Sequence, residues 1–390
     1  MKAIHFSKYL FLLTAILFVS LPSCDKNNED PAGPPLLSHV TAIKDTTQTF
    51  LTGGNMGDWI AIHGKNLATA YKIYFNDVEV DMEEVYYENE VLYLQIPIRI
   101  PLEVTDQLKV ITKGGETSFT FTVGVPDLEL TGMFNEYTLP GDTIKIYGKF
   151  LDLYEVDKDN TVVVFGDIQT PVIKNGGTFI TAKVPVNVQA NVKVKAINSK
   201  YSATAICPGY YQDKHSVITT FDDDFPSKSI GANWASIVTL VDEKTGKPLS
   251  SGKCIKLFVN QDNAPSGLGW WYFYEHIPYA YTADMAANPE NYILKFELNM
   301  FNPINTTRFC MYYWWNQESA STDNYILKAG GDYLNVQTFR VWQTISIPFE
   351  VFRPKGKGNP ERFSIRVESF APVEPVHMYI DNFRIYKKGE

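Results

Sequence analysis

The sequence predicts an all-β protein made of three successive β-sandwiches. Apolar and polar residues alternate along short segments such as Thr143–Ile146, and turn signals recur every 8–12 residues or so. One block of the chain repeats at a distance suited to a small sandwich domain. Aromatic residues make up 14% of the chain, which favours strands, and no long stretch has a helical period.

The composition limits the classes of protein to consider. With 390 residues and 45% hydrophobic content, the chain is long enough for several domains with their own cores. It has 44 acidic and 35 basic residues, for a net charge of −9. This balance argues against nucleic acid as the main partner.

The N-terminus carries an export signal. Lys2 and Lys8 accompany an apolar run over 9–21 that is too short to span a membrane, which predicts a signal peptide over residues 1–23. The end of this run, Leu-Pro-Ser-Cys24, resembles a bacterial lipoprotein box, although the proline is unusual there. The resemblance implies that Cys24 is lipidated after cleavage. The polar, proline-rich residues 24–36 then form a tether.

The acidic residues that follow Cys24 resemble the surface-export signal of Bacteroidetes lipoproteins. This resemblance implies a lipid-anchored protein on the outer face of the outer membrane, because several acyl chains together anchor a protein stably.

Two copies of one pattern follow the tether. Residues 57–67, Gly-Asp-Trp-Ile-Ala-Ile-His-Gly-Lys-Asn-Leu, recur at 141–151 with seven of eleven positions identical and an offset of 84 residues. A Phe-x-Asp-Val/Ile step and a Val/Ile-Pro-Val/Ile step also recur further along. The glycine spacing and the later proline step resemble the IPT/TIG immunoglobulin-like fold. The resemblance implies two tandem domains, 37–125 and 126–209, that act as spacers.

The third segment, 210–390, has a different composition. Six of the seven tryptophans lie in it, and two clusters are dense in aromatic residues, 269–274 and 309–316. Side chains alternate between the two faces of a strand, so each cluster has aromatic residues on both faces. Core burial explains any single ring, but two adjacent tryptophan pairs favour exposed binding platforms. The expected platform residues are Trp270, Trp271, Trp314 and Trp315, with Tyr272, Tyr313 and Asn316 as weaker candidates.

Such platforms suit a sugar, because the C–H face of a pyranose ring stacks on the face of an aromatic ring. Amide and carboxylate side chains near both clusters can bind the hydroxyls. Alternation predicts that about half of the rings face the ligand, and the sequence does not choose which half. Trp342, in a separate predicted strand, is expected to be structural.

The ends of the third segment support a jelly-roll-like carbohydrate-binding sandwich. Alternating segments open it near 218–224 and close it near 376–386, and 292–300 and 341–348 read as further strands. With the lipoprotein box and the two repeats, the chain resembles the surface glycan-binding proteins of Bacteroidetes polysaccharide-utilisation loci. The resemblance implies binding of xyloglucan or a related β-glucan or β-mannan, which is passed to a TonB-dependent transporter and its surface lipoprotein.

No catalytic or metal-binding motif stands out, so we predict that the protein is not an enzyme and needs no cofactor. Asp222 and Asp381 could meet where the first and last strands pair and hold a structural Ca²⁺, but a solvated acidic turn is favoured. At most one disulfide can form among Cys207, Cys254 and Cys310, and buried free thiols are equally plausible.

Two other functions compete with glycan binding. A surface adhesin would use its tryptophans as core residues and bind a protein. A glycoside hydrolase would need two convergent carboxylates beside the aromatic strip. Solvent-exposed rings along one strip distinguish the binding protein from the adhesin.

Overall fold

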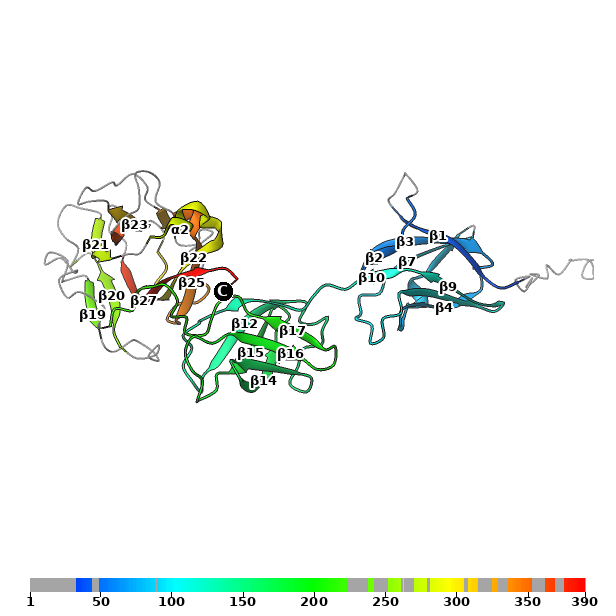
Figure 1. Cartoon of the computed structure of the whole chain (residues 1–390), viewed down its shortest axis with the longest axis horizontal. Coiled ribbons are helices and arrows are strands. Elements are labelled where there is room, and N and C mark those ends of the chain that lie inside the picture. Colours follow the sequence, from blue (N-terminus) through cyan, green and yellow to red (C-terminus); the bar gives the residue numbers. More distant parts are fainter. Residues whose placement is uncertain are drawn as a thin grey trace, which may run out of the picture. The chain divides into compact units, whose positions relative to one another are not determined.

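The computed structural model describes residues 33–43, 49–88, 90–222, 238–241, 252–260, 262, 270–278, 281–304, 308–314, 325–328, 336–352, 362–368 and 375–389. The predicted signal peptide and Cys24 lie outside these residues. The described chain is all-β, as the sequence predicts. It divides into two compact units, and the boundary along the chain lies between Val125 and Pro126 (Figure 1).

The first unit contains two four-stranded antiparallel sheets. One has the order β1-β3-β7-β6, with bounds Leu36–Ala42, Trp59–Lys65, Val91–Gln95 and Tyr86–Glu88. The other has the order β5-β4-β8-β9, with bounds Val78–Glu79, Ala70–Phe75, Gln107–Thr112 and Gly115–Thr120. A short parallel pair, β10 (Thr122–Gly124) and β2 (Gly53–Asn55), and a 3₁₀ turn, η1 (Met82–Glu84), complete the unit.

The core of the first unit comes from the alternating apolar positions of both sheets. Buried residues such as Ile60 and Ile62 on β3 and Ile73 and Phe75 on β4 belong to one cluster. Trp59, at the start of β3, is 44% exposed, so it lies on the solvent side of its strand.

The second unit begins with a seven-stranded sheet, drawn in cyan to green in Figure 1. Its order is β11-β12-β15-β14-β13-β16-β17, with bounds Glu129–Met133, Thr143–Lys149, Phe179–Lys183, Ile168–Asn175, Thr161–Phe165, Val194–Asn198 and Ala203–Ile206. The long strand β14 pairs with β13 through its first half and with β15 through its second half, which contains a bulge between Val172 and Lys174. It therefore joins what are two separate sheets in the first unit.

Both copies of the sequence repeat adopt the same local structure. β1 pairs with β3, and β3 with β7, as β11 pairs with β12, and β12 with β15. Gly57 and Gly141 precede the equivalent strands with φ of 83° and 85°, a conformation that favours glycine. The hairpin turns after β4 and β13 also match, with Asn76 and Gly166 at φ of 55° and 60°.

The C-terminal part of the second unit has two sheets. The order β19-β20-β27-β22-β25 has the bounds Val238–Val241, Cys254–Val259, Val376–Lys387, Tyr292–Met300 and Gln343–Pro348, and β18 (Val217–Thr219) also pairs with β27. The order β21-β26-β23-β24 has the bounds Trp270–Pro278, Arg362–Glu368, Arg308–Trp314 and Tyr325–Lys328. The helical elements are short: α2 (Ala283–Ala287), η3 (Pro289–Asn291) and α3 (Phe349–Phe352).

Strand β27 is buried along almost its whole length, because its two faces meet different partners. On one face, Phe383 stacks on Phe296 of β22 at 4.8 Å and meets Phe221 edge-on at 6.0 Å, in an aromatic core. On the other face, Arg384 contacts Glu136 of the seven-stranded part. The first and last predicted strands of the segment are neighbours, as expected, since β18 pairs with β27. Within the described ranges, no helix is long and apolar enough to cross a membrane.

Candidate functional site

The predicted platform residues belong to the sheet β21-β26-β23-β24. Strand β26 lies in the middle of three antiparallel strands, with β21 on one side and β23 on the other. Trp270 and Arg308 both pair with Glu368 at one end of β26, and Trp314 pairs with Arg362 at the other. The two aromatic clusters, about 40 residues apart in sequence, therefore occupy one sheet.

The two tryptophan positions lie far enough apart to span several sugar rings. Glu368 and Arg362 are six positions apart along β26, which corresponds to roughly 20 Å at the rise of a β-strand. β21 and β23 flank β26, so the positions also differ by two strand spacings, roughly 10 Å.

The register divides the residues of this sheet between two faces, because directly paired residues share a face. One face carries charged, hydroxyl-bearing and aromatic positions together with three less polar ones, Pro278, Cys310 and Ile326. The others on this face are Trp270, Tyr272, Arg308, Tyr312, Trp314, Lys328, Arg362, Ser364, Arg366 and Glu368. The other face carries almost only apolar and aromatic positions: Trp271, Tyr274, Phe309, Met311, Tyr313, Tyr325, Leu327, Phe363, Ile365 and Val367. We call these the polar face and the apolar face.

In sandwiches, the face of a sheet that carries apolar residues generally covers the core, and the face that carries polar residues generally meets water. Of the predicted site residues, Trp270, Tyr272 and Trp314 occupy the polar face, whereas Trp271 and Tyr313 occupy the apolar face. Trp315 and Asn316 lie outside the described residues. A register shift between Tyr272 and Tyr274 pairs Tyr274 with Ile365, so that Tyr274 lies on the apolar face, and a second shift follows before Ile277.

The other sheet of this part of the chain is fixed to the seven-stranded sheet by buried charges. Glu136, which is 3% exposed, accepts hydrogen bonds from the Lys295 ammonium and, at 2.6 Å, from the Arg384 guanidinium. Arg384 also binds both oxygens of Glu297, at 2.8 and 2.9 Å. The backbone N–H of Glu136 donates to the hydroxyl of Thr344, 2.8 Å away. We call Glu136, Lys295, Glu297 and Arg384 the ion cluster.

The two carboxyls of the ion cluster differ in their protonation energetics. Burial raises the pKa of Glu136, but attraction to Lys295 and Arg384 outweighs it, so the net pKa lies below its ordinary value. For Glu297, burial dominates over Arg384 and the pKa is raised. The pKa of Arg384 lies well above its ordinary value, since its carboxylates outweigh its burial. Because both partners of each pair are desolvated, loss of one charge would leave another buried without compensation.

Sequence reasoning did not identify the ion cluster. A signal was present, since Leu-Lys295-Phe-Glu297-Leu places two charges at alternate positions of an otherwise apolar strand. Such alternation on a buried strand indicates that the second face meets charged groups. The partner Glu136 lies 159 residues away in sequence from Lys295, so its identity required the fold.

The remaining sequence candidates have local structural contacts. Asp381, on β27, is buried and accepts a hydrogen bond from the Asn382 backbone at 2.9 Å, and Asp222 accepts one from the Lys253 backbone. Among the side chains that the structure describes, no group of three or more His, Cys, Asp or Glu could hold a metal ion. Cys207 and Cys254 are buried, and burial raises the pKa of the Cys207 thiol to about 12. Trp342 is 6% exposed and packs in a core cluster, as predicted.

Comparison with known proteins relates this site to glycan binding. Residues 211–387 match the family described as the surface glycan-binding protein B xyloglucan binding domain. The matched family is a binding domain, in agreement with the prediction that the protein is not an enzyme. No curated protein matches the chain.

Solved structures of proteins described as surface glycan-binding protein B align with nearly the whole chain. Surface glycan-binding protein B of Prevotella bryantii is 17% identical, over 92% of this chain and 99% of its own, with a TM-score of 0.57. The protein from a complex xyloglucan utilization locus of Bacteroides uniformis is 16% identical, over 90% and 99%, with a TM-score of 0.47. The Bacteroides ovatus protein solved with a mixed-linkage heptasaccharide is 11% identical, over 87% and 76%, with a TM-score of 0.26. The likeness to the Prevotella bryantii protein supports a shared fold.

Proposed function

We propose that this chain, which is similar to surface glycan-binding protein B and carries a xyloglucan-binding domain over 211–387, binds a plant-type β-glucan on the polar face of the β21-β26-β23-β24 sheet. Xyloglucan is the first ligand we expect, with mixed-linkage glucan and β-mannan as related ones. The register of the sheet carries this proposal, because Trp270, Tyr272 and Trp314 occupy one face together with charged positions.

Binding on this face combines two interactions. Aromatic rings stack on the C–H faces of sugar rings, and their spacing selects an extended chain over a compact one. We expect Arg308, Arg366, Glu368 and Ser364, whose positions share this face, to bind the sugar hydroxyls. Trp315 and Asn316, which follow Trp314 directly, remain candidates at the end of the strip, and Trp271 and Tyr313 are assigned to the core.

The rest of the chain positions this site at the cell surface in our proposal. Cys24 carries the lipid anchor in the outer membrane, and residues 24–36 are the tether. Domains 37–125 and 126–209 are tandem IPT/TIG-like spacers, and 210–390 is the glycan-binding domain. Many weak sites on one membrane raise the total affinity for a long polysaccharide, which is then delivered to a TonB-dependent transporter and its surface lipoprotein.

Affinity gel electrophoresis of the full chain, carrying Cys24→Ser so that no lipid is attached, tests this proposal. The gels contain xyloglucan, mixed-linkage glucan, galactomannan or an unrelated α-glucan. We expect retardation by the β-linked glycans only, and a loss of retardation with Trp270→Ala or Trp314→Ala. Trp59→Ala is the matched control, because Trp59 is an exposed tryptophan in the first unit.

Two results would contradict the proposal. Absence of retardation by every glycan favours an adhesin whose tryptophans are core residues. Release of reducing sugar from a retarded glycan indicates a hydrolase. Unchanged circular dichroism of each variant shows that the substitution has acted on binding and not on folding.

A further inference from the structure

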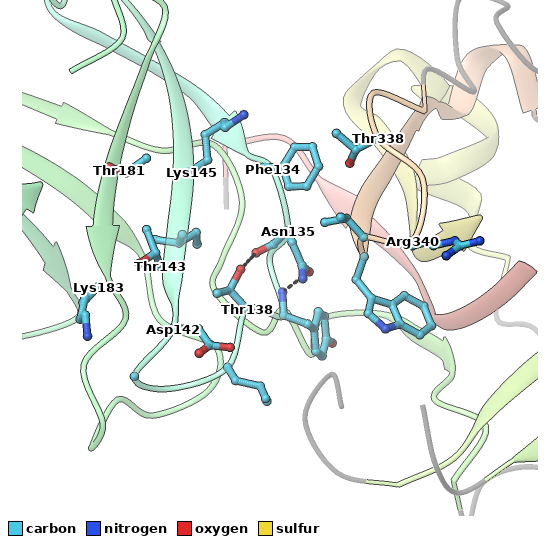
Figure 2. A pocket seen from close by; sticks show the side chains of 16 residues that line it. Phe134, Asn135, Thr138, Asp142, Thr143, Lys145, Thr181, Lys183, Thr338 and Arg340 are labelled. Atoms are coloured by element: carbon cyan, nitrogen blue, oxygen red, sulfur yellow. Dashed lines mark hydrogen bonds between the residues drawn. The ribbon is translucent and has the colours of Figure 1, made fainter. Parts of the chain in front are cut away.

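A cavity of about 760 Å³ lies between the seven-stranded sheet and the C-terminal part of the second unit. Its volume is in the range of small-molecule sites. Figure 2 shows Thr143, Lys145, Thr181 and Lys183 on one side, on strands β12 and β15, and Thr338 and Arg340 on the opposite side. None of these residues belongs to the polar face.

One wall of the cavity has an ordered pattern of lysine and threonine. Lys145 pairs with Thr181 across β12 and β15, and Thr143 pairs with Lys183, so all four residues share a sheet face. The two lysines are diagonal neighbours on this face, a placement that separates their strand positions by roughly 7–8 Å. Lys145 lies over the rings of Phe134 and Phe179, at 5.3 and 4.7 Å, which fixes the position of its ammonium group.

The charges of the lining are unlike those of the whole protein. The chain carries −9, yet the lining has three cations, Lys145, Lys183 and Arg340, and one carboxylate, Asp142. Within the described part of the chain, no ion pair neutralises any of these three cations. In the ion cluster, by contrast, each charged side chain forms an ion pair.

We propose that this cavity binds an acidic oligosaccharide, one that carries uronic-acid carboxylates. The cations are distributed along the lining and not focused on one point, which suits repeated carboxylates better than a single compact anion. Charge-assisted hydrogen bonds from the lysines and Arg340 hold the carboxylates. The hydroxyls of Thr143, Thr181 and Thr338 bind the neutral sugar hydroxyls, because a hydroxyl can donate and accept.

This site is independent of the polar face and takes a different ligand. A protein with both sites would hold a neutral and an acidic glycan at once, for example from one mixed polymer network. The acidic site would depend strongly on salt, because exposed charges are screened over roughly 8–10 Å at physiological ionic strength.

Isothermal titration calorimetry of the full chain with Cys24→Ser, at low salt, tests the proposal with trigalacturonic acid and neutral cellotriose. We expect trigalacturonic acid to bind, and Lys145→Met and Lys183→Met each to weaken it by about two- to five-fold. Lys174→Met is the matched control, because Lys174 is an exposed lysine of the same seven-stranded sheet that does not line the cavity. The Lys174→Met variant should bind trigalacturonic acid with the same affinity as the unmodified chain.

Three results would overturn the proposal: no binding of trigalacturonic acid, an equal effect of Lys174→Met, or equally tight binding of inorganic tripolyphosphate, which would show charge attraction alone. Trp270→Ala and Trp314→Ala separate the two sites. They abolish xyloglucan binding if the proposed function holds and leave trigalacturonic acid binding unchanged.

Discussion

At the scale of single residues, the second unit depends on Arg384 and its three carboxylate neighbours. The guanidinium is fully buried, contacts Glu136 and Glu297 at 2.6–2.9 Å, and has Asp213 at 3.9 Å from Nε. Such a group is tolerated in a core only because its charge and most of its hydrogen-bond donors are satisfied. The cluster therefore fixes one arrangement of the two parts that contribute to it.

Glu136→Gln should destabilise the second unit by about 3–5 kcal/mol, because it leaves Lys295 and Arg384 with less negative charge in a buried site. Glu129→Gln is the matched control. Glu129 forms an exposed ion pair with Lys149 at 2.9 Å, and such pairs contribute about 0–1 kcal/mol. Urea unfolding followed by tryptophan fluorescence measures both changes, and equal losses in the two variants would argue against the cluster.

The pKa of Glu136 predicts that the stability of the second unit depends on pH. The folded-state pKa of Glu136 lies below its ordinary value of 4.5, so its stabilising effect is present above that value and is lost as the pH falls through the folded pKa. The difference in unfolding free energy between the unmodified chain and Glu136→Gln should therefore shrink in acid. Unfolding measured at pH 7 and at successively lower pH tests this, and a constant difference would mean that Glu136 stays paired throughout.

At the scale of elements, sequence patterns predicted the strands well and their faces less well. The expected strand 292–300 is β22, and 341–348 contains β25. The repeat predicted equivalent strands, and the structure gives them equivalent pairing. The choice between Trp270 and Trp271 needed the cross-strand register, since alternation within one strand leaves both faces aromatic. The partner of Lys295 could be identified only from the tertiary fold, because Glu136 lies 159 residues away in sequence.

Substitution of Gly64 and Gly148, which occupy equivalent positions of the two repeats, tests whether the repeats are structurally equivalent. A Cβ at Gly148 would lie 2.6 Å from the Glu129 carbonyl oxygen of the paired strand, and one at Gly64 would lie 2.1 Å from the Leu36 carbonyl oxygen. We expect Gly148→Ala and Gly64→Ala each to destabilise by about 1–3 kcal/mol, in different units, because the paired strands must separate. Thermal unfolding measures both.

Gly389→Ala is the control for these two substitutions, since nothing lies within 4 Å of the added Cβ, although its φ of 87° adds some local strain near the C-terminus. A loss in Gly148→Ala no greater than in this control would show that β11 and β12 tolerate the extra carbon, and that the glycine pattern has no packing role.

At the scale of the whole molecule, the seven-stranded sheet and the C-terminal part of the chain form one compact unit, Pro126–Glu390, because the ion cluster crosses between them. The sequence predicted the change of composition near residue 210 but had no means of predicting this interface. The polar face and the cavity thus belong to the same unit.

A fragment of residues 126–390 should therefore unfold cooperatively and at higher urea concentration than a fragment of 210–390. The shorter fragment exposes Lys295, Glu297 and Arg384, which are buried in the whole chain, and it loses the contacts of Glu136. Equilibrium unfolding of both fragments, with tryptophan fluorescence and circular dichroism, gives the comparison. Equal stability of the two would mean that the parts are joined only by the chain.

The central claim concerns which face of the β21-β26-β23-β24 sheet binds glycan, and a crystal structure of the full chain with a xyloglucan oligosaccharide tests it most directly. We predict sugar rings stacked at Trp270 and Trp314, with the chain running across β26. An oligosaccharide bound elsewhere, at the exposed Trp59 of the first unit or in the cavity beside Lys145, would contradict the account.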